Sequence, residues 1–267
     1  MTEGDRMIEA GGIPHRVRID GTSGPWVVFS NSLGCTLEMW DEQVAVLSAG
    51  HRVLRYDTRG HGGSGSTSGP YDFELLAGDL LAILDAVGVE RCTLVGLSMG
   101  GMIAQHAALA QPERFTGLAL ADTTSHYGRE VSDFWAGRAA TALSQGLDSI
   151  ALTTPLRWFT PALVARNPEL VRRYQRTLRT TNPEGYAGCC AAIPHIDTTA
   201  RLPAIDVPVA VIVGEHDPST TIEHARRLHA AIAGSTLHII PEAAHLSNVE
   251  QPEHFTRILL DLLRGTP

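Results

Sequence analysis

A short stretch around residue 98 constrains the fold more than any other part of the chain. Residues 92–95 form an apolar run typical of a buried strand, and residues 102–110 form an alanine-rich run typical of a helix. Gly96, Ser98 and Gly100 lie between these runs with G-x-S-x-G spacing. Gly and Ser are also common turn residues, but a strand directly before the motif and a helix directly after it are the context of a nucleophile elbow. We therefore expect Ser98 at a sharp, strained turn from strand to helix.

The position expected for Ser98 suits a serine nucleophile. It would lie at the N-terminus of a helix, where free backbone N–H groups and the helix dipole favour a developing negative charge. A serine hydroxyl is nevertheless a poor nucleophile at neutral pH, so it needs a base and a group that orients the base. An elbow of this kind therefore predicts a carboxylate and a histidine later in the chain.

The composition disfavours several other classes of protein. The chain has 267 residues, 43% of them hydrophobic, which is enough for the core of one large domain or two small ones. Its net charge of −8 disfavours nucleic acid and anionic membrane surfaces as partners. Residues 1–15 carry no apolar signal region, and no run is long enough to span a membrane.

The cysteines and histidines predict neither a disulfide framework nor a metal site. The four cysteines lack C-x-x-C spacing, and two of them are neighbours, so we expect a reduced, cytoplasmic protein. The twelve histidines include no H-E-x-x-H or H-x-H motif, so we expect no metal.

Strands and helices alternate through most of the chain. Residues 7–20 alternate loosely and end at a turn signal, which predicts one or two antiparallel edge strands. Apolar runs predict further strands at residues 26–30, 52–56, 92–95, 118–121, 209–213 and 237–240. Helical spacing is found at residues 40–47, 76–87, 102–110, 225–232 and 255–263. This rhythm predicts an α/β fold, with a mostly parallel central sheet and helices on both faces.

The alternation breaks between residues 123 and 201. This segment shows helical stretches and several prolines but no clear strand. We expect a helical cap at residues 124–200, inserted into an α/β core made of residues 1–123 and 201–267. Beyond the cap, Thr220 and Glu223 have capping-box spacing and predict the start of the next helix.

Two late loops offer the partners of the serine. Asp217 and His245 lie in the loops that follow the last two predicted strands. Because the carboxyl ends of parallel strands meet at one edge of a sheet, we assign Asp217 as the acid and His245 as the base. An ordinary loop histidine is the alternative for His245. Glu215 and Asp122, which also follow predicted strands, are alternatives for the acid.

An oxyanion formed on a substrate carbonyl needs two backbone N–H donors. Met99, the residue after the nucleophile, should supply one of them. The other should come from the loop after the strand at residues 26–30, where we choose Leu33. The alternative for residues 31–34 is a plain turn.

Four cap residues are candidates for substrate binding: Trp135, Arg138, Arg157 and Trp158. The arginines could clamp a substrate carboxylate, and the tryptophans could line a pocket. The alternatives are solvated arginines and aromatic residues that fill the core of the cap. The glycine-rich loop at residues 57–64 carries Asp, Arg and His, but we interpret it as mostly structural.

Together these motifs resemble the α/β-hydrolase superfamily over nearly the whole chain. The resemblance lies in the elbow at residues 96–101, the loop at 57–64, Gly214-x-x-Asp217 and the closing segment at 245–255. A narrower similarity, to the 3-oxoadipate enol-lactonases, lies in residues 30–34, 39–41, 52–62, 157–160 and 184–186. Asn31-Ser32, where most capped hydrolases carry His-Gly, points the same way.

The resemblance implies an enzyme that opens a five-membered enol-lactone to 3-oxoadipate during bacterial breakdown of aromatic acids. It implies no metal and no organic cofactor, and a small carboxylated lactone as the partner. Position by position, Ser98, Asp217 and His245 match the catalytic triad. Leu33 and Met99 match the oxyanion donors.

Two segments depart from the family pattern. Residues 122–127 replace an expected Asn-Thr-Ala type sequence, and residues 193–197 replace an expected small and acidic stretch. Both bear on the substrate more than on the reaction type. The alternatives to a lactonase are a broad carboxylesterase, a hydrolase of carbon–carbon bonds in ring-cleavage products, and a ligand receptor on the same fold. The sequence is compatible with a monomer or a homo-oligomer.

Overall fold

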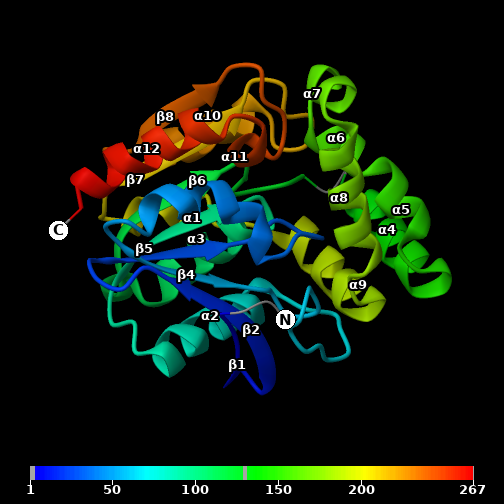
Figure 1. Ribbon diagram of the computed structural model, residues 1–267, viewed down its shortest axis with the longest axis horizontal. Helices are drawn as coiled ribbons and strands as arrows, with labels where there is room; N and C mark the ends of the chain where they lie inside the picture. Colours follow the sequence, from blue (N-terminus) through cyan, green and yellow to red (C-terminus); the bar gives the residue numbers. More distant parts are fainter. Residues whose placement is uncertain (1–3, 129–130, 267) are drawn as a thin grey trace.

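One mostly parallel sheet forms the centre of the molecule. The computed structural model describes residues 4–128 and 131–266, and in this part of the chain eight strands follow the order β1-β2-β4-β3-β5-β6-β7-β8 (Figure 1). They are β1 (Asp5–Ala10), β2 (Ile13–Asp20), β3 (Trp26–Ser30), β4 (Arg52–Tyr56), β5 (Cys92–Leu97), β6 (Phe115–Ala121), β7 (Val209–Gly214) and β8 (Thr236–Ile240). β2 is antiparallel to both β1 and β4, and the remaining pairs are parallel. The predicted sheet is confirmed, and the antiparallel edge, expected to have one or two strands, has two, β1 and β2.

Helices cover both faces of this sheet. α1 (Asp41–Leu47) and α12 (Pro252–Arg264) pack together on one face, and α2 (Phe73–Val87) and α3 (Met99–Ala110) pack together on the other (Figure 1). The short α11 (Ser247–Glu250) precedes α12, and α10 (Ile222–Ala231) packs against β7 and β8. Short 3-10 helices are η1 (Leu37–Trp40), η2 (Pro112–Arg114), η4 (Ile193–His195) and η5 (Leu202–Ala204). With both faces covered, β5 and β7 are buried at every residue, which explains their unbroken apolar runs.

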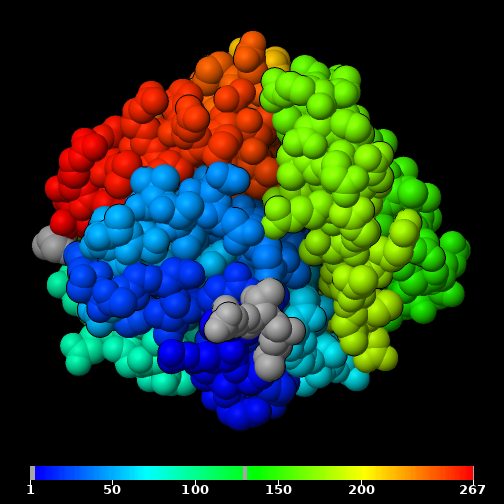
Figure 2. Space-filling view, in the orientation of Figure 1, coloured from blue at the N-terminus to red at the C-terminus, as the bar shows by residue number. Residues whose placement is uncertain are grey.

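A group of helices lies between β6 and β7 in the sequence and to one side of the sheet in space. These helices are α4 (Ser132–Gln145), α5 (Asp148–Thr153), α6 (Pro155–Trp158), α7 (Pro161–Arg166), α8 (Pro168–Arg179) and α9 (Pro183–Ala192). Four of them begin at a proline, whose fixed φ and missing N–H suit the first helical position. Figure 2 shows this segment, in green to yellow-green, covering one side of the molecule.

One predicted helix start is wrong by a residue. The capping box of α10 is formed by Thr221 and His224, not by Thr220 and Glu223. The Thr221 side chain accepts from the His224 N–H, and the His224 ring accepts from the Thr221 N–H. The Thr220 hydroxyl instead donates to Asp217, because that buried carboxylate needs the hydrogen bond.

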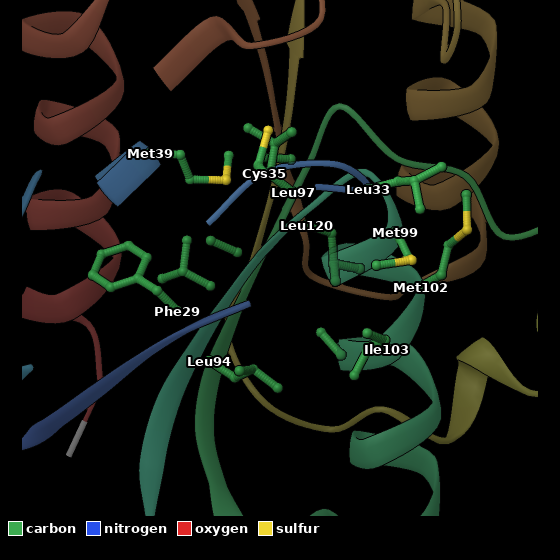
Figure 3. Close-up of a cluster of buried hydrophobic side chains, with 14 of the residues drawn as sticks. Phe29, Leu33, Cys35, Met39, Leu94, Leu97, Met99, Met102, Ile103 and Leu120 are labelled. Atoms are coloured by element: carbon green, nitrogen blue, oxygen red, sulfur yellow. The ribbon is translucent and has the colours of Figure 1, made fainter. Parts of the chain in front are cut away.

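Buried apolar side chains from several elements surround the turn between β5 and α3. Figure 3 shows them gathered in one cluster drawn from β3, β5, β6, α3 and the segment after β3. Its labelled members are Phe29, Leu33, Cys35, Met39, Leu94, Leu97, Met99, Met102, Ile103 and Leu120. Interiors packed in this way leave little room for movement, so the cluster fixes the elbow in place.

All four cysteines are free and buried. Among the described residues, no helix combines the length and the apolar character that crossing a membrane would require.

Candidate active site

The elbow places Ser98 in a strained conformation between β5 and α3. Its φ of 57° and ψ of −118° lie outside the regions that a residue with a side chain readily adopts. The two glycines of the motif are required by close backbone contacts. A Cβ at Gly96 would lie 2.3 Å from the Gly100 carbonyl oxygen, and a Cβ at Gly100 would lie 2.1 Å from the Ser30 carbonyl oxygen. The predicted elbow is therefore present, and its glycines make the sharp turn sterically feasible.

Three side chains from separate loops meet at this turn. The His245 Nε2 lies 2.9 Å from the Ser98 Oγ, and the His245 Nδ1 lies 2.8 Å from the Asp217 Oδ2. Ser98 precedes α3, Asp217 follows β7 and His245 follows β8. The parallel strands bring these loops to one edge of the sheet, as expected from the sequence. These distances suit a nucleophile, a base and a group that orients the base.

Asp217 is held by donors from its own loop. Its carboxylate accepts the Ser219 N–H at 2.7 Å, the Thr220 N–H at 3.1 Å and the Thr220 hydroxyl at 2.6 Å. Burial raises the pKa of Asp217, but the charge of His245 and these hydrogen bonds outweigh burial, so the pKa lies below its usual value. Asp217 is therefore a fixed negative charge at neutral pH. The sequence did not reveal the part played by Thr220.

The electrostatic environment of His245 favours its protonated form. The side chain is buried, and burial lowers its pKa, but the charge of Asp217 and the hydrogen bond to it more than compensate. The pKa of His245 is therefore raised above its ordinary value. An imidazole in this position can take up a proton from Ser98, because the resulting positive charge is stabilised by Asp217.

Glu215 and Asp122, the two alternatives for the acid, form hydrogen bonds to groups other than His245. Glu215 is exposed, and its carboxylate accepts the Glu242 N–H at 3.2 Å. Asp122 is fully buried and accepts the Gly214 N–H at 2.8 Å. Among the described residues, the carboxylate hydrogen-bonded to His245 is that of Asp217.

The loop after β3 is fixed by buried hydrogen bonds. The Asn31 amide group donates to the Tyr56 carbonyl at 2.7 Å and accepts the Trp40 indole N–H at 2.9 Å. Leu33, two residues later, borders the same cavity as Ser98. Met99 is the first residue of α3, so its N–H has no acceptor within the helix. This geometry is compatible with Leu33 and Met99 as oxyanion donors.

A cavity of about 410 Å³ lies above Ser98 and His245. α4 and α6 supply part of its wall. All four residues predicted to bind substrate border the cavity: Trp135 and Arg138 from α4, and Arg157 and Trp158 from α6. Tyr127, Phe134 and Tyr186 add further aromatic surface. Apart from His245, the ionisable residues bordering the cavity in the described part of the chain are tyrosines and two arginines, without a carboxylate. The cavity therefore suits a ligand with an apolar body and a negative charge.

The two arginines are held differently. The Arg138 Nε donates to the Tyr186 hydroxyl and its Nη2 donates to the Thr154 hydroxyl, both at 2.5 Å. Its guanidinium also lies over the rings of Tyr186 and Phe134, at 5.5 and 5.9 Å from their centroids. Neutral partners fix this cation without neutralising it. Arg157 is exposed, and its guanidinium has no ion pair within residues 4–128 and 131–266.

Within the described residues, no group of three or more His, Cys, Asp or Glu side chains could hold a metal ion. The loop at residues 57–64 contributes to buried ion pairs instead. The Arg59 guanidinium donates to both oxygens of Asp79, and Asp57 accepts from Arg16 and from the backbone of Leu37 and Gly63. These contacts agree with the structural interpretation of that loop.

Comparisons with known proteins give a consistent result. A family model described as "alpha/beta hydrolase fold" matches residues 25–252. 3-Oxoadipate enol-lactonase 2 of Acinetobacter baylyi is 42% identical over 231 residues, which are 86% of this chain and 85% of that protein. 3-Oxoadipate enol-lactonase 1 of the same organism is 37% identical over 250 residues, 93% of this chain and 92% of that protein.

A solved structure extends the comparison to three dimensions. The crystal structure of the enol-lactonase from Burkholderia xenovorans LB400 superposes with a TM-score of 0.93 at 39% sequence identity. The match covers 97% of this chain and 100% of that chain.

Proposed function

This chain belongs to the α/β-hydrolase fold family and, within it, to the 3-oxoadipate enol-lactonases, and we propose that it hydrolyses an enol-lactone through Ser98, His245 and Asp217. The family resemblance inferred from the motifs is confirmed. The observation that carries the residue assignment is the hydrogen-bonded series from Asp217 through His245 to Ser98 at the floor of the cavity. The substrate class in this proposal is a small carboxylated lactone, and the Acinetobacter relatives are named for 3-oxoadipate enol-lactone.

The first half of the reaction opens the ring. The Ser98 Oγ attacks the lactone carbonyl, and the His245 Nε2 takes the hydroxyl proton while Asp217 stabilises the imidazolium. The N–H groups of Leu33 and Met99 bind the oxyanion. When the intermediate collapses, the bond from the carbonyl carbon to the enol oxygen breaks, and His245 returns its proton to that oxygen. The product of this half is an acyl-enzyme that carries an enol.

The second half releases the acid. His245 takes a proton from a water molecule, which attacks the acyl carbonyl, and the proton passes to the Ser98 Oγ as the ester bond breaks. The freed enol rearranges to the ketone. No step requires a metal ion or an organic cofactor.

The cap supplies substrate selection in this proposal. Arg138 and Arg157 attract the substrate carboxylate, and Trp135 and Trp158 pack against the ring. Arg138 is the stronger candidate because its guanidinium is already held in place by Tyr186 and Thr154. We assign residues 124–200 to this cap and residues 1–123 and 201–267 to the core, because α4 to α9 all lie between β6 and β7.

We further propose that the protein works in the reduced cytoplasm on a small molecule, without nucleic acid or a membrane as partner. The acidic net charge of −8 and the four buried thiols support this assignment.

A broad carboxylesterase is the second candidate. The cavity volume of about 410 Å³ falls within the range of about 300 to 1,000 Å³ that accommodates drug-sized ligands, so it leaves room for esters larger than a five-membered lactone.

Initial rates on 3-oxoadipate enol-lactone, on a neutral aryl acetate and on a carbon–carbon ring-cleavage product distinguish these functions. A kcat/KM at least about 100-fold higher for the lactone than for the acetate supports the lactonase. A preference for the acetate supports a broad carboxylesterase instead. A preference for the ring-cleavage product supports a hydrolase of carbon–carbon bonds. Stabilisation by the lactone without turnover indicates a receptor.

A further inference from the structure

A second buried carboxyl group lies beside the triad. Asp122 is the first residue after β6, and none of its surface is exposed. Its φ of 43° is in the left-handed region, which a residue with a side chain adopts only when its surroundings stabilise it. The proposed reaction gives Asp122 no role, so its burial and strained backbone call for an explanation.

The hydrogen bonds of Asp122 join the two loops that carry the acid and the base. Its Oδ1 accepts the Gly214 N–H at 2.8 Å, and its Oδ2 accepts the Ser247 hydroxyl at 2.5 Å. The Ser247 N–H points to the same Oδ2 at 3.4 Å. Gly214 is the last residue of β7, just before the turn with Asp217, and Ser247 lies two residues after His245. Asp122 therefore holds both partners of the nucleophile at a fixed separation.

The charged groups that face Asp122 are few. Asp217, from the loop after β7, and His245, from the loop after β8, act on it electrostatically. No arginine is paired with it among the described residues. Arg157 of the cap acts electrostatically on His245. Burial raises the pKa of Asp122 most, and the negative charge of Asp217 raises it further. The cation that could offset a charge on Asp122 is thus the imidazolium of His245.

We propose that Asp122 is a second acidic positioning residue of the triad, which ties the His245 loop to the Asp217 loop and whose negative charge, when it forms, makes His245 a stronger base. This inference rests on the proposed roles of Ser98, Asp217 and His245. It assigns Asp122 no contact with substrate.

The pH dependence follows from the sign of the interaction. A negative charge on Asp122 stabilises the imidazolium of His245 and so raises the pKa of that base. The charge of His245 lowers the pKa of Asp122, and the charge of Asp122 raises the pKa of His245. Each ionisation therefore changes the other, so the wild-type activity should rise over a broader pH range than a single ionisation gives. In Asp122→Asn no such charge can form. His245 should therefore lose its proton at lower pH, and its titration should follow a single ionisation.

The test uses an organic fluorophosphonate, which labels an activated serine and does not depend on the lactone. The second-order rate constant for labelling of Ser98 is measured from pH 5 to pH 10 in wild type, Asp122→Asn and Ser247→Ala. In Asp122→Asn we expect the midpoint of the rise to move about one pH unit to lower pH. Ser247→Ala keeps the Asp122 carboxyl group but removes the hydroxyl that donates to it. The plateau of the labelling rate constant should therefore fall in this variant, and the midpoint should move less than in Asp122→Asn.

The outcomes separate the inference from the proposed function. An Asp122→Asn midpoint equal to that of wild type, with only a lower plateau, would show a purely structural role and overturn the inference. If Asp122→Asn does not fold, the wild-type profile decides, because a rise that fits a single ionisation contradicts an effect of the Asp122 charge on His245. Failure of the reagent to label Ser98 at any pH refutes the proposed function, and the inference with it.

Discussion

Replacement of Arg138 by methionine tests the proposed role of this residue in substrate selection. Methionine keeps much of the side-chain volume but removes the guanidinium that the Tyr186 and Thr154 hydroxyls hold at 2.5 Å. Because both of these partners are neutral, the charge of Arg138 is free to bind a substrate carboxylate. A hydrogen bond to a charged group contributes about 1.5 to 3 kcal/mol, which corresponds to a loss of about 10- to 150-fold in kcat/KM.

The assay compares two substrates in the same variant. For the carboxylated lactone we expect the loss just given, and for a neutral aryl acetate we expect a loss of less than about threefold. Arg166→Met, which removes an exposed cap arginine that does not border the cavity, is the matched control. An equal loss on both substrates would show that Arg138 only supports the fold of the cap. An unchanged rate on the lactone would place the substrate carboxylate elsewhere.

Two further substitutions test the supports of the triad. Thr220→Val removes the hydroxyl that donates to Asp217, so kcat should fall about tenfold in the lactone assay. That hydrogen bond lowers the pKa of Asp217, so the loss of unfolding free energy should be full at neutral pH and should shrink as the pH falls below about 4, which urea titrations can measure. Gly100→Ala places a methyl group 2.1 Å from the Ser30 carbonyl oxygen, so it should cost about 1 to 3 kcal/mol of unfolding free energy and displace Ser98. Two results would contradict these accounts. One is a loss of unfolding free energy in Thr220→Val that stays constant down to pH 3, and the other is wild-type activity in Gly100→Ala.

The sequence predicted the strands well because most of them are buried on both faces. β4 was predicted with its observed bounds, and β7 lacked only Gly214. The start of β6 was missed because Thr116 and Gly117 interrupt the apolar run. In the structure this segment pairs with β5 across a register shift between Cys92 and Thr93, so tertiary pairing overrides the local sequence preference.

The three residues proposed for catalysis were predictable because each follows a strand that the sequence itself indicates. Ser98, Asp217 and His245 follow strands whose carboxyl ends meet, so topology alone brings them close together. The contacts that hold them are not local. Asp122 finds its two partners 92 and 125 residues away, and nothing in the sequence indicates that its carboxyl group bonds Gly214 and Ser247 instead of His245.

The activity of Ser98→Ala on 3-oxoadipate enol-lactone tests the central claim most directly. Ser144→Ala, in which an exposed serine of α4 is removed, serves as the control for purity and folding. We predict that kcat of Ser98→Ala falls by about 10⁴-fold or more, while Ser144→Ala keeps the wild-type rate. A Ser98→Ala variant that opens the lactone within about tenfold of the wild-type rate would contradict serine catalysis at this site.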